Sequence, residues 1–171
     1  MDAEHYPVVV VGVDHHRTPV ALRERLAAAG EPVWTALAAR GDALLLSTCN
    51  RFECWLGGEE ADAAAFLARA TGVAANELAP HLYVHRAAAG VRHLFRVVSG
   101  LESLVPGEYQ IVNQVKAAYE RAQGAGVAGA ALHPLFQGAL AVGKDVRAGT
   151  ALGRHRLSVA SVACDLARQV L

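Results

Sequence analysis

The stretch Ser47-Thr48-Cys49-Asn50-Arg51-Phe52-Glu53 decides the fold, because it places a polar turn between two apolar segments. The run Ala43–Leu46 precedes it, and apolar and polar residues alternate from Arg51 to Leu56. A short apolar run and a period of two are both typical of strands. The pattern predicts a strand, a tight turn and a second strand.

The alternation sorts the side chains of the second strand, because successive residues of a strand point to opposite faces. One face is predicted to enter the core and carries Phe52, Cys54 and Leu56. Arg51 and Glu53 lie on the other face with Trp55, so they can flank one site beside Cys49. Cys54 is then a buried, inert thiol.

Cys49 is the candidate nucleophile. A thiol at the exposed end of a strand can attack an electrophile if its thiolate is stabilised, and Arg51 and the free N–H groups of a turn favour that form. The alternative is that Cys49 is a small buried residue and that Arg51 and Glu53 form a surface ion pair. The polar density of the turn favours the functional interpretation.

Composition predicts a globular protein with one domain or two small subdomains. The chain has 171 residues, of which 53% are hydrophobic, and it has a formal net charge of zero. Zero net charge argues against a non-specific nucleic-acid binder. No apolar run is long enough to span a membrane, and no secretory signal is visible. Three Cys without framework spacing are typical of reduced, cytoplasmic thiols.

The order of elements predicts the fold class. The predicted order is β-α-β-β-α-β. It begins with a strand at Val8–Val13 and helices starting near Thr18 and Pro32. The two strands around Cys49, a helix over 59–70 and a short strand at 82–85 follow. We expect an α+β, ferredoxin-like split βαβ sandwich over residues 1–86 that carries the nucleophile. Helical stripes predict a helical subdomain over 87–156 that completes the active site. A last stripe still running at Leu171 predicts that 157–171 begin a longer helix.

Two further places could carry chemistry. His93 lies at the edge of an apolar helical stripe and could act as an acid, a base or an orienting group, although a surface or half-buried structural histidine is the simpler interpretation. In the polar connection 100–110, Ser103 and Gln110 could donate hydrogen bonds to a substrate. Glu108 lies near the start of the next helix, where a favourable interaction with the helix dipole is a sufficient structural reason for its presence. Cys49 and Cys54 have zinc-finger spacing, but alternation separates them and no second ligand pair follows, so no metal is expected.

The residues at 47–53 resemble the Ser-Thr-Cys-Asn-Arg-x-Glu signature of glutamyl-tRNA reductases, which begin tetrapyrrole synthesis from glutamate. Residues 11–20, 23–25, 100–110 and 157–161 resemble the same family, in the same order. The resemblance implies the catalytic domain of such an enzyme. In the family this domain is followed by a spinal helix, an NADPH-binding domain and a dimerisation domain. NADPH would therefore bind outside this chain, which also lacks a G-x-G-x-x-G after a strand.

The resemblance also implies roles for individual residues. Cys49 would attack the ester of glutamyl-tRNA and form a glutamyl thioester, which hydride from NADPH would reduce to glutamate-1-semialdehyde. His93 matches the family's active-site histidine. The residues that match or extend the glutamate pocket are Thr48, Arg51, Glu53, Ser103, Glu108 and Gln110. Arg51 would pair with the substrate carboxylate, and Glu53 or Glu108 with its ammonium group.

The family further implies a homodimer and a partnership with glutamate-1-semialdehyde aminomutase. Late basic residues, among them Lys144 and Arg147, would contact tRNA phosphates. The chain departs from the family at Gly149, where Glu is usual, and at Pro106 and Tyr109. A haem contact at Cys164 is a further hypothesis. The alternative function is a non-reducing glutamyl-tRNA-binding or haem-responsive regulatory homologue.

Overall fold

The sheet at the centre of the protein has four antiparallel strands in the order β2-β3-β1-β4. We describe a computed structural model that covers residues 3–105, 107–108, 110–150, 152 and 168. The strands are β1 (Val8–Asp14), β2 (Ala43–Ser47), β3 (Arg51–Gly57) and β4 (Tyr83–Arg86). This order and the helical connections confirm the predicted ferredoxin-like sandwich.

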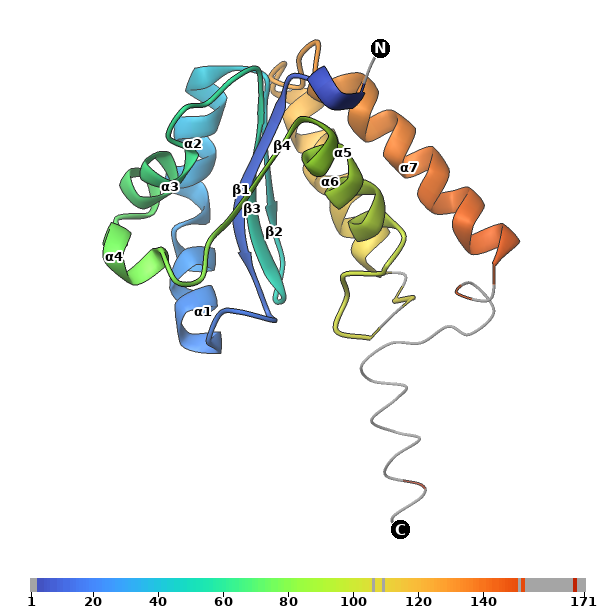
Figure 1. The fold of residues 1–171 in the computed structure, drawn as a ribbon, viewed down its shortest axis with the longest axis horizontal. Coiled ribbons are helices and arrows are strands. Elements are labelled where there is room, and N and C mark those ends of the chain that lie inside the picture. Colours follow the sequence, from blue (N-terminus) through green and yellow to red (C-terminus); the bar gives the residue numbers. More distant parts are fainter. Residues whose placement is uncertain (1–2, 106, 109, 151, 153–167, 169–171) are drawn as a thin grey trace.

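Helices cover both faces of the sheet (Figure 1). On one face lie α1 (Val20–Ala28), α2 (Gly30–Arg40), α3 (Ala63–Thr71) and α4 (Ala75–Leu78). On the other lie α5 (Ala87–Val98), α6 (Gln110–Gly124) and α7 (Leu132–Gly149), and a short 3-10 helix, η1 (Ala3–His5), precedes β1. No helix in the described part of the chain is long and apolar enough to cross a membrane.

The two helical layers give the sheet two apolar cores. Phe52, Cys54 and Leu56 pack toward α1–α4, as the alternation of β3 predicts. Trp55, from the opposite face of β3, is fully buried in the core formed with α5–α7. The face of β3 that the sequence predicts to flank a site is therefore covered by helices rather than open to solvent.

Local boundaries differ from the sequence prediction at two places. α2 begins at Gly30, before the start predicted near Pro32, so that only Ala29 lies between α1 and α2. The helix expected from residue 59 begins at Ala63, because the Asp62 side chain accepts a hydrogen bond from the N–H of Ala65 at 2.8 Å and caps it. The division at residues 86 and 87 stays a prediction, and the helix predicted over 157–171 lies outside the described residues apart from Arg168.

Asp42 joins the start of β2 to the start of α7. Its carboxylate accepts hydrogen bonds from the backbone N–H groups of Gly129 at 2.8 Å, Ala131 at 2.9 Å and Leu132 at 3.2 Å. The N–H groups of Ala131 and Leu132 are among those that the start of α7 leaves without helical partners. Asp42 also has a φ of 38°, a conformation that Asp and Asn tolerate better than Ala.

We expect Asp42→Ala to lower the free energy of unfolding by about 1–3 kcal/mol, because three donors lose their acceptor and the backbone is strained. Asp42→Asn keeps an acceptor oxygen and the tolerance for positive φ, so it should lose less. Urea denaturation of the three proteins measures the difference. Equal losses for the two variants would show that the carboxylate charge, and not the hydrogen-bonding geometry, is what matters.

Candidate functional site

The turn between β2 and β3 holds Cys49 at the end of the sheet. The Thr48 hydroxyl accepts hydrogen bonds from the N–H groups of Asn50 at 3.2 Å and Arg51 at 3.1 Å, and the Thr48 N–H donates to the carbonyl of Arg51 at 2.9 Å. From α1, Arg23 Nε donates to the carbonyl of Cys49 at 3.2 Å. These bonds fix the backbone on both sides of an exposed thiol.

The two cysteines have opposite environments. Cys49 is exposed, so the alternative in which it is a small buried residue is wrong. Cys54 is fully buried, and burial together with the neighbouring Glu53 raises the pKa of its thiol far above the usual range. This confirms the prediction that Cys54 is a buried thiol. The nucleophilic candidate is therefore Cys49 alone among the cysteines of the described residues.

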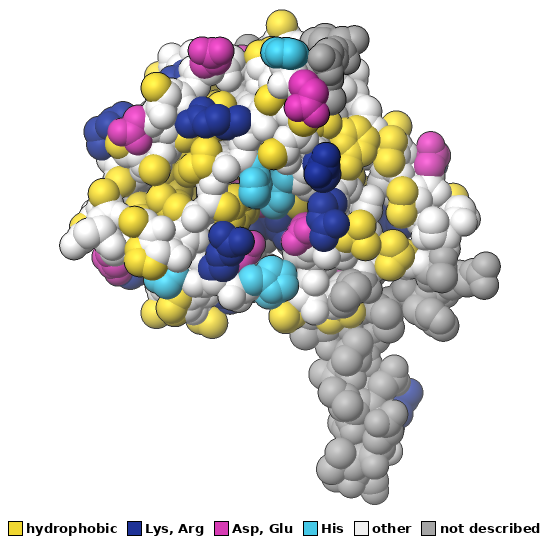
Figure 2. Space-filling view, viewed as in Figure 1, with side chains coloured by type: hydrophobic (Ala, Val, Ile, Leu, Met, Phe, Trp, Pro, Cys, Tyr) yellow, Lys and Arg dark blue, Asp and Glu magenta, His cyan; other side chains and the backbone are white. Residues whose placement is uncertain are grey.

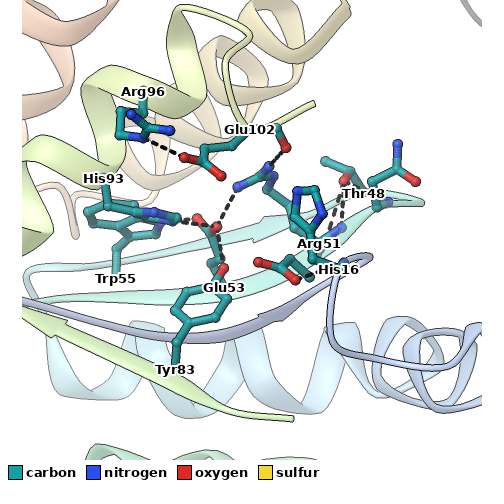
Figure 3. A network of polar contacts seen from close by, with 11 residues as sticks. His16, Thr48, Arg51, Glu53, Trp55, Tyr83, His93, Arg96 and Glu102 are labelled. Carbon is teal, nitrogen blue, oxygen red and sulfur yellow. Dashed lines mark hydrogen bonds and ion pairs between the residues drawn. The ribbon is translucent and has the colours of Figure 1, made fainter. Parts of the chain in front are cut away.

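Glu53 is the centre of a buried polar network (Figure 3). Its Oε1 accepts from Arg51 at 2.9 Å, from the Tyr83 hydroxyl at 2.6 Å and from His93 Nε2 at 2.9 Å. Its Oε2 accepts from the Trp55 indole at 2.9 Å. An ionised carboxylate can accept all four bonds, and since it only accepts, the Nε2 of His93 must carry a hydrogen.

The charge of Glu53 is stable because its partners outweigh its burial. Burial alone would raise the pKa of this carboxyl, but Arg51, His93 and the hydrogen bonds hold the pKa well below its usual range. Room for the side chain comes from Gly12, which lies opposite Glu53 in β1. A Cβ at Gly12 would lie 2.8 Å from Glu53 Cγ and 2.5 Å from the carbonyl oxygen of Phe52, so a larger residue there would displace the network.

A small polar pocket lies beside the thiol, and we call it the thiol pocket. It is formed by the turn, by the connection after α5 and by the first turns of α6. Its residues are Thr48, Cys49, Asn50, Arg51, Ser103, Glu108, Gln110, Ile111 and Gln114. Its volume of about 20 Å³ is room for about one water molecule. A larger ligand requires these walls to separate.

Two carboxylates were candidates for binding a substrate ammonium group, and the structure distinguishes them. Both carboxylate oxygens of Glu53 accept hydrogen bonds from protein donors, and Glu53 lines no part of the thiol pocket. Glu108 lines that pocket, is 9% exposed and forms no ion pair with another described residue. Glu108 is thus the carboxylate that a cation in the thiol pocket would meet.

His93 lies in a different pocket from Cys49. This histidine pocket has a volume of about 350 Å³ and is lined by Asp14, Arg17, Tyr83, His85, Ala89, Arg92, His93, Arg96 and Glu102. Arginine and histidine side chains surround a hollow on this face of the molecule (Figure 2). The wall between the pockets is Arg51, whose guanidinium donates to the carbonyl of Glu102. Figure 3 shows Arg51 between Thr48 and the Glu53–His93 pair.

Residues 11–150 match the family described as "Glutamyl-tRNAGlu reductase, N-terminal domain". The chain belongs to this family. It is 46% identical over 167 residues to the glutamyl-tRNA reductase of Deinococcus radiodurans and 43% identical over 172 residues to that of Herpetosiphon aurantiacus. It also matches the solved structure of glutamyl-tRNA reductase from Methanopyrus kandleri, with 34% identity and a TM-score of 0.73.

These matches cover nearly all of this chain and less than half of each relative. The match to the D. radiodurans enzyme covers 95% of this chain, the match to the H. aurantiacus enzyme 96% and the match to the M. kandleri structure 97%. The share of the relative is 47%, 42% and 40%, respectively. The chain therefore matches only one part of each glutamyl-tRNA reductase. We assign the activity of the whole enzyme to it only as a proposal.

The thiol pocket brings together most of the predicted site. Thr48, Cys49, Arg51, Ser103, Glu108 and Gln110 all line it, whereas Glu53 and His93 do not. No described contact joins His93 to Cys49, so a catalytic role for His93 stays a prediction. Of the departures from the family pattern, Gly149 ends α7 in an exposed position, while Pro106 and Tyr109 lie outside the described residues, as does Cys164.

Sequence reasoning missed three residues of the thiol pocket, Asn50, Ile111 and Gln114. Gln114 is four residues after Gln110 on α6, and residues at this spacing lie on the same helix face. That spacing was the available signal. No group of His, Cys, Asp or Glu side chains in the described part of the chain is placed to hold a metal ion.

Proposed function

We propose that this chain is the acyl-transfer domain of an NADPH-dependent glutamyl-tRNA reductase. The observation that carries the proposal is an exposed thiol, Cys49, at the mouth of a pocket lined by charged and amide side chains. The Cys49 thiolate attacks the ester carbonyl of glutamyl-tRNA. The bond from sulfur to carbon forms, the ester C–O bond breaks, and tRNA leaves with a free hydroxyl while glutamate remains as a thioester on Cys49.

Recognition of the glutamyl group follows from the charges of the thiol pocket. Glu108 meets the α-ammonium group, because its carboxylate is not engaged with another described charge. Arg51, of whose five N–H donors one bonds Glu53 and one the carbonyl of Glu102, retains donors for the substrate carboxylate. Ser103, Gln110 and Gln114 supply further polar atoms. A buried polar site of this kind discriminates strongly against a ligand that leaves its groups unpaired.

The positions of the Glu53 partners suggest that Glu53 and His93 act together. Glu53 holds the His93 ring by its Nε2, and the ring also stacks on Trp55 with centroids 5.9 Å apart. This arrangement fixes the ring, and its Nδ1 has no hydrogen-bond partner among the described residues. His93 and Arg51 both bond the Glu53 carboxylate, so His93 acts by helping to position Glu53 and Arg51. It does not take a proton from Cys49 directly, because the two residues line different pockets.

In the whole enzyme, NADPH would supply the hydride that reduces the thioester. The described residues do not fit this cofactor, because their sheet is antiparallel and contains no parallel strand–loop–helix unit of a dinucleotide-binding fold. We therefore assign no NADPH contact to the described residues. For the whole enzyme, we propose that the product is glutamate-1-semialdehyde and that it passes to an aminomutase. We also propose that the enzyme is a homodimer in the cytoplasm.

The test is the intact mass of the chain after mixing with glutamyl-tRNA without NADPH and quenching in acid. We expect a glutamyl adduct with glutamyl-tRNA and a yield at least about tenfold lower with glutaminyl-tRNA, whose amide leaves polar groups of the pocket unpaired. No adduct, together with no faster deacylation than in buffer, would contradict acyl transfer. Binding of glutamyl-tRNA without an adduct would instead identify a binding module.

A further inference from the structure

Cys49 stands between two pockets, of which only one has been assigned. The second, which we call the α1 pocket, shares Thr48, Cys49 and Asn50 with the thiol pocket. Its other wall is one face of α1, with Val20, Arg23, Glu24 and Ala27. Its volume is about 250 Å³, against about 20 Å³ for the thiol pocket. The two pockets differ in chemistry as well as in size.

An aminoacyl ester has two halves that must lie on different sides of the attacked carbon. The acyl half carries the ammonium and carboxylate groups of glutamate, and the charged and amide groups of the thiol pocket suit it. The other half is the ribose and base of the terminal nucleoside, which carry no charge. Because both pockets include Cys49, an ester attacked by this thiol can place one half in each.

The walls of the α1 pocket suit a nucleoside. Val20 is 58% exposed, the most exposed large apolar side chain among the described residues, and Ala27 adds to the apolar surface. Arg23 is held at two points, with Nε on the carbonyl of Cys49 and a terminal nitrogen on the carbonyl of Thr18 at 2.6 Å. A guanidinium plane fixed in this way offers a surface on which a base can stack, as in single-stranded nucleic-acid recognition.

The size of the α1 pocket limits what it can hold. Its volume of about 250 Å³ is slightly below the range of about 300–1,000 Å³ that is typical of small-molecule sites. One nucleoside is of this scale, whereas a duplex is not. Glu24, on the exposed side of the pocket, forms no ion pair with another described residue and can accept a hydrogen bond from an exocyclic amino group.

The histidine pocket is a poorer candidate for the same ligand. It is larger and more basic, with Arg17, Arg92 and Arg96 on its walls. It does not include Cys49, and the bond between Arg51 and the carbonyl of Glu102 closes it from the thiol. A group bonded directly to the attacked ester carbon cannot lie behind that wall.

We propose that the α1 pocket binds the 3′-terminal nucleoside of the aminoacylated tRNA, which is the leaving group of acyl transfer. This inference rests on the proposed function and extends it by giving the two halves of the substrate separate subsites. In the step itself the thiolate sulfur bonds to the carbonyl carbon as the bond to the ribose oxygen breaks. The proton lost by the thiol is balanced by the proton gained by the ribose hydroxyl.

The test compares two acyl donors on the same variant. Val20→Asp places a charge where the base would rest, and since Val20 is exposed, the fold should tolerate it. With glutamyl-tRNA we expect the rate of adduct formation to fall about tenfold or more, in line with the loss of a base-stacking contact. With the α-thioester of glutamate and 2-mercaptoethanol, which has no nucleoside, the rate should stay within about twofold of the wild-type rate. Val142→Asp, the same change at an exposed position of α7, is the control and should affect neither donor.

A binding measurement separates this inference from the proposed function. Adenosine 5′-monophosphate, titrated into ¹⁵N-labelled chain, should shift the amide signals of Val20, Arg23 and Ala27, and Val20→Asp should remove the shifts. A chain that forms the adduct but shows neither the shifts nor the donor-dependent loss would overturn the inference and leave the proposed function standing. Shifts on α1 without any adduct would support the pocket and contradict acyl transfer. Equal slowing of both donors would show that Val20 shapes the nucleophile, which also overturns the inference.

Discussion

Replacing Cys49 with Ser should abolish the glutamyl adduct, with the rate of acyl transfer falling by a factor of at least about 1,000. A serine hydroxyl is a weak nucleophile unless a neighbouring base removes its proton. Among the described residues, no histidine lines either pocket that contains position 49, and His93 lies in the histidine pocket. The serine would therefore have no activating group, and a hydroxyl is intrinsically a much weaker nucleophile than the thiol it replaces. Intact mass and the rate of glutamyl-tRNA deacylation measure the effect.

Cys54→Ala is the matched control for Cys49→Ser, because it also removes one thiol. Cys54 is fully buried toward α1–α4 and cannot meet a tRNA ester without unfolding. This variant should retain the adduct at about the wild-type rate, with only a small loss of stability from the shortened core side chain. An adduct that survives Cys49→Ser and disappears in Cys54→Ala would contradict the assignment of the nucleophile.

The strand–turn–strand unit around Cys49 was predictable because its pattern is local. An apolar run, a polar turn and a period of two specify β2, the turn and β3 without reference to the rest of the chain. The alternation also assigns Phe52 and Cys54 to a core face correctly. It could not show that the opposite face is covered too, because that depends on where α5–α7 pack.

The role of Glu53 could not be predicted for the same reason. Its donors Tyr83 and His93 lie 30 and 40 residues away along the chain, on β4 and α5. Their meeting depends on the antiparallel pairing of β1 with β4 and on the packing of α5 over the sheet. The resemblance places Glu53 in the family signature but does not separate a residue that touches substrate from one that holds the site in shape.

The relation between the pockets was likewise invisible in the sequence. The signature places Arg51 two residues from Cys49, which suggests one continuous site. In the structure the Arg51 side chain is only 2% exposed, and it turns inward to Glu53 and to the carbonyl of Glu102. Arg51 therefore divides the thiol pocket from the histidine pocket. A side-chain direction of this kind follows from tertiary packing and not from spacing.

Glu53→Gln should lower the free energy of unfolding by about 3–5 kcal/mol at pH 7, because it leaves the buried Arg51 guanidinium without its counter-charge. The amide that replaces the carboxylate also turns an N–H₂ group toward donors that need an acceptor. Urea denaturation measures the loss. The control is Glu102→Gln, which removes the partly exposed ion pair with Arg96 and should cost no more than about 1 kcal/mol.

The pH dependence of stability distinguishes this charge effect from a packing effect. The pKa of Glu53 is lowered in the folded protein, and an unfolded Glu has a pKa of about 4.3. Above that value both states are ionised and the stabilisation is complete. As the pH falls below it, the unfolded state binds a proton that the folded state does not, so stability is lost by up to about 1.4 kcal/mol per pH unit. The difference in stability between wild type and Glu53→Gln should therefore shrink between about pH 5 and pH 3. A difference that stays constant over this range would mean that the shape of the side chain, rather than its charge, holds Arg51 and His93 in place.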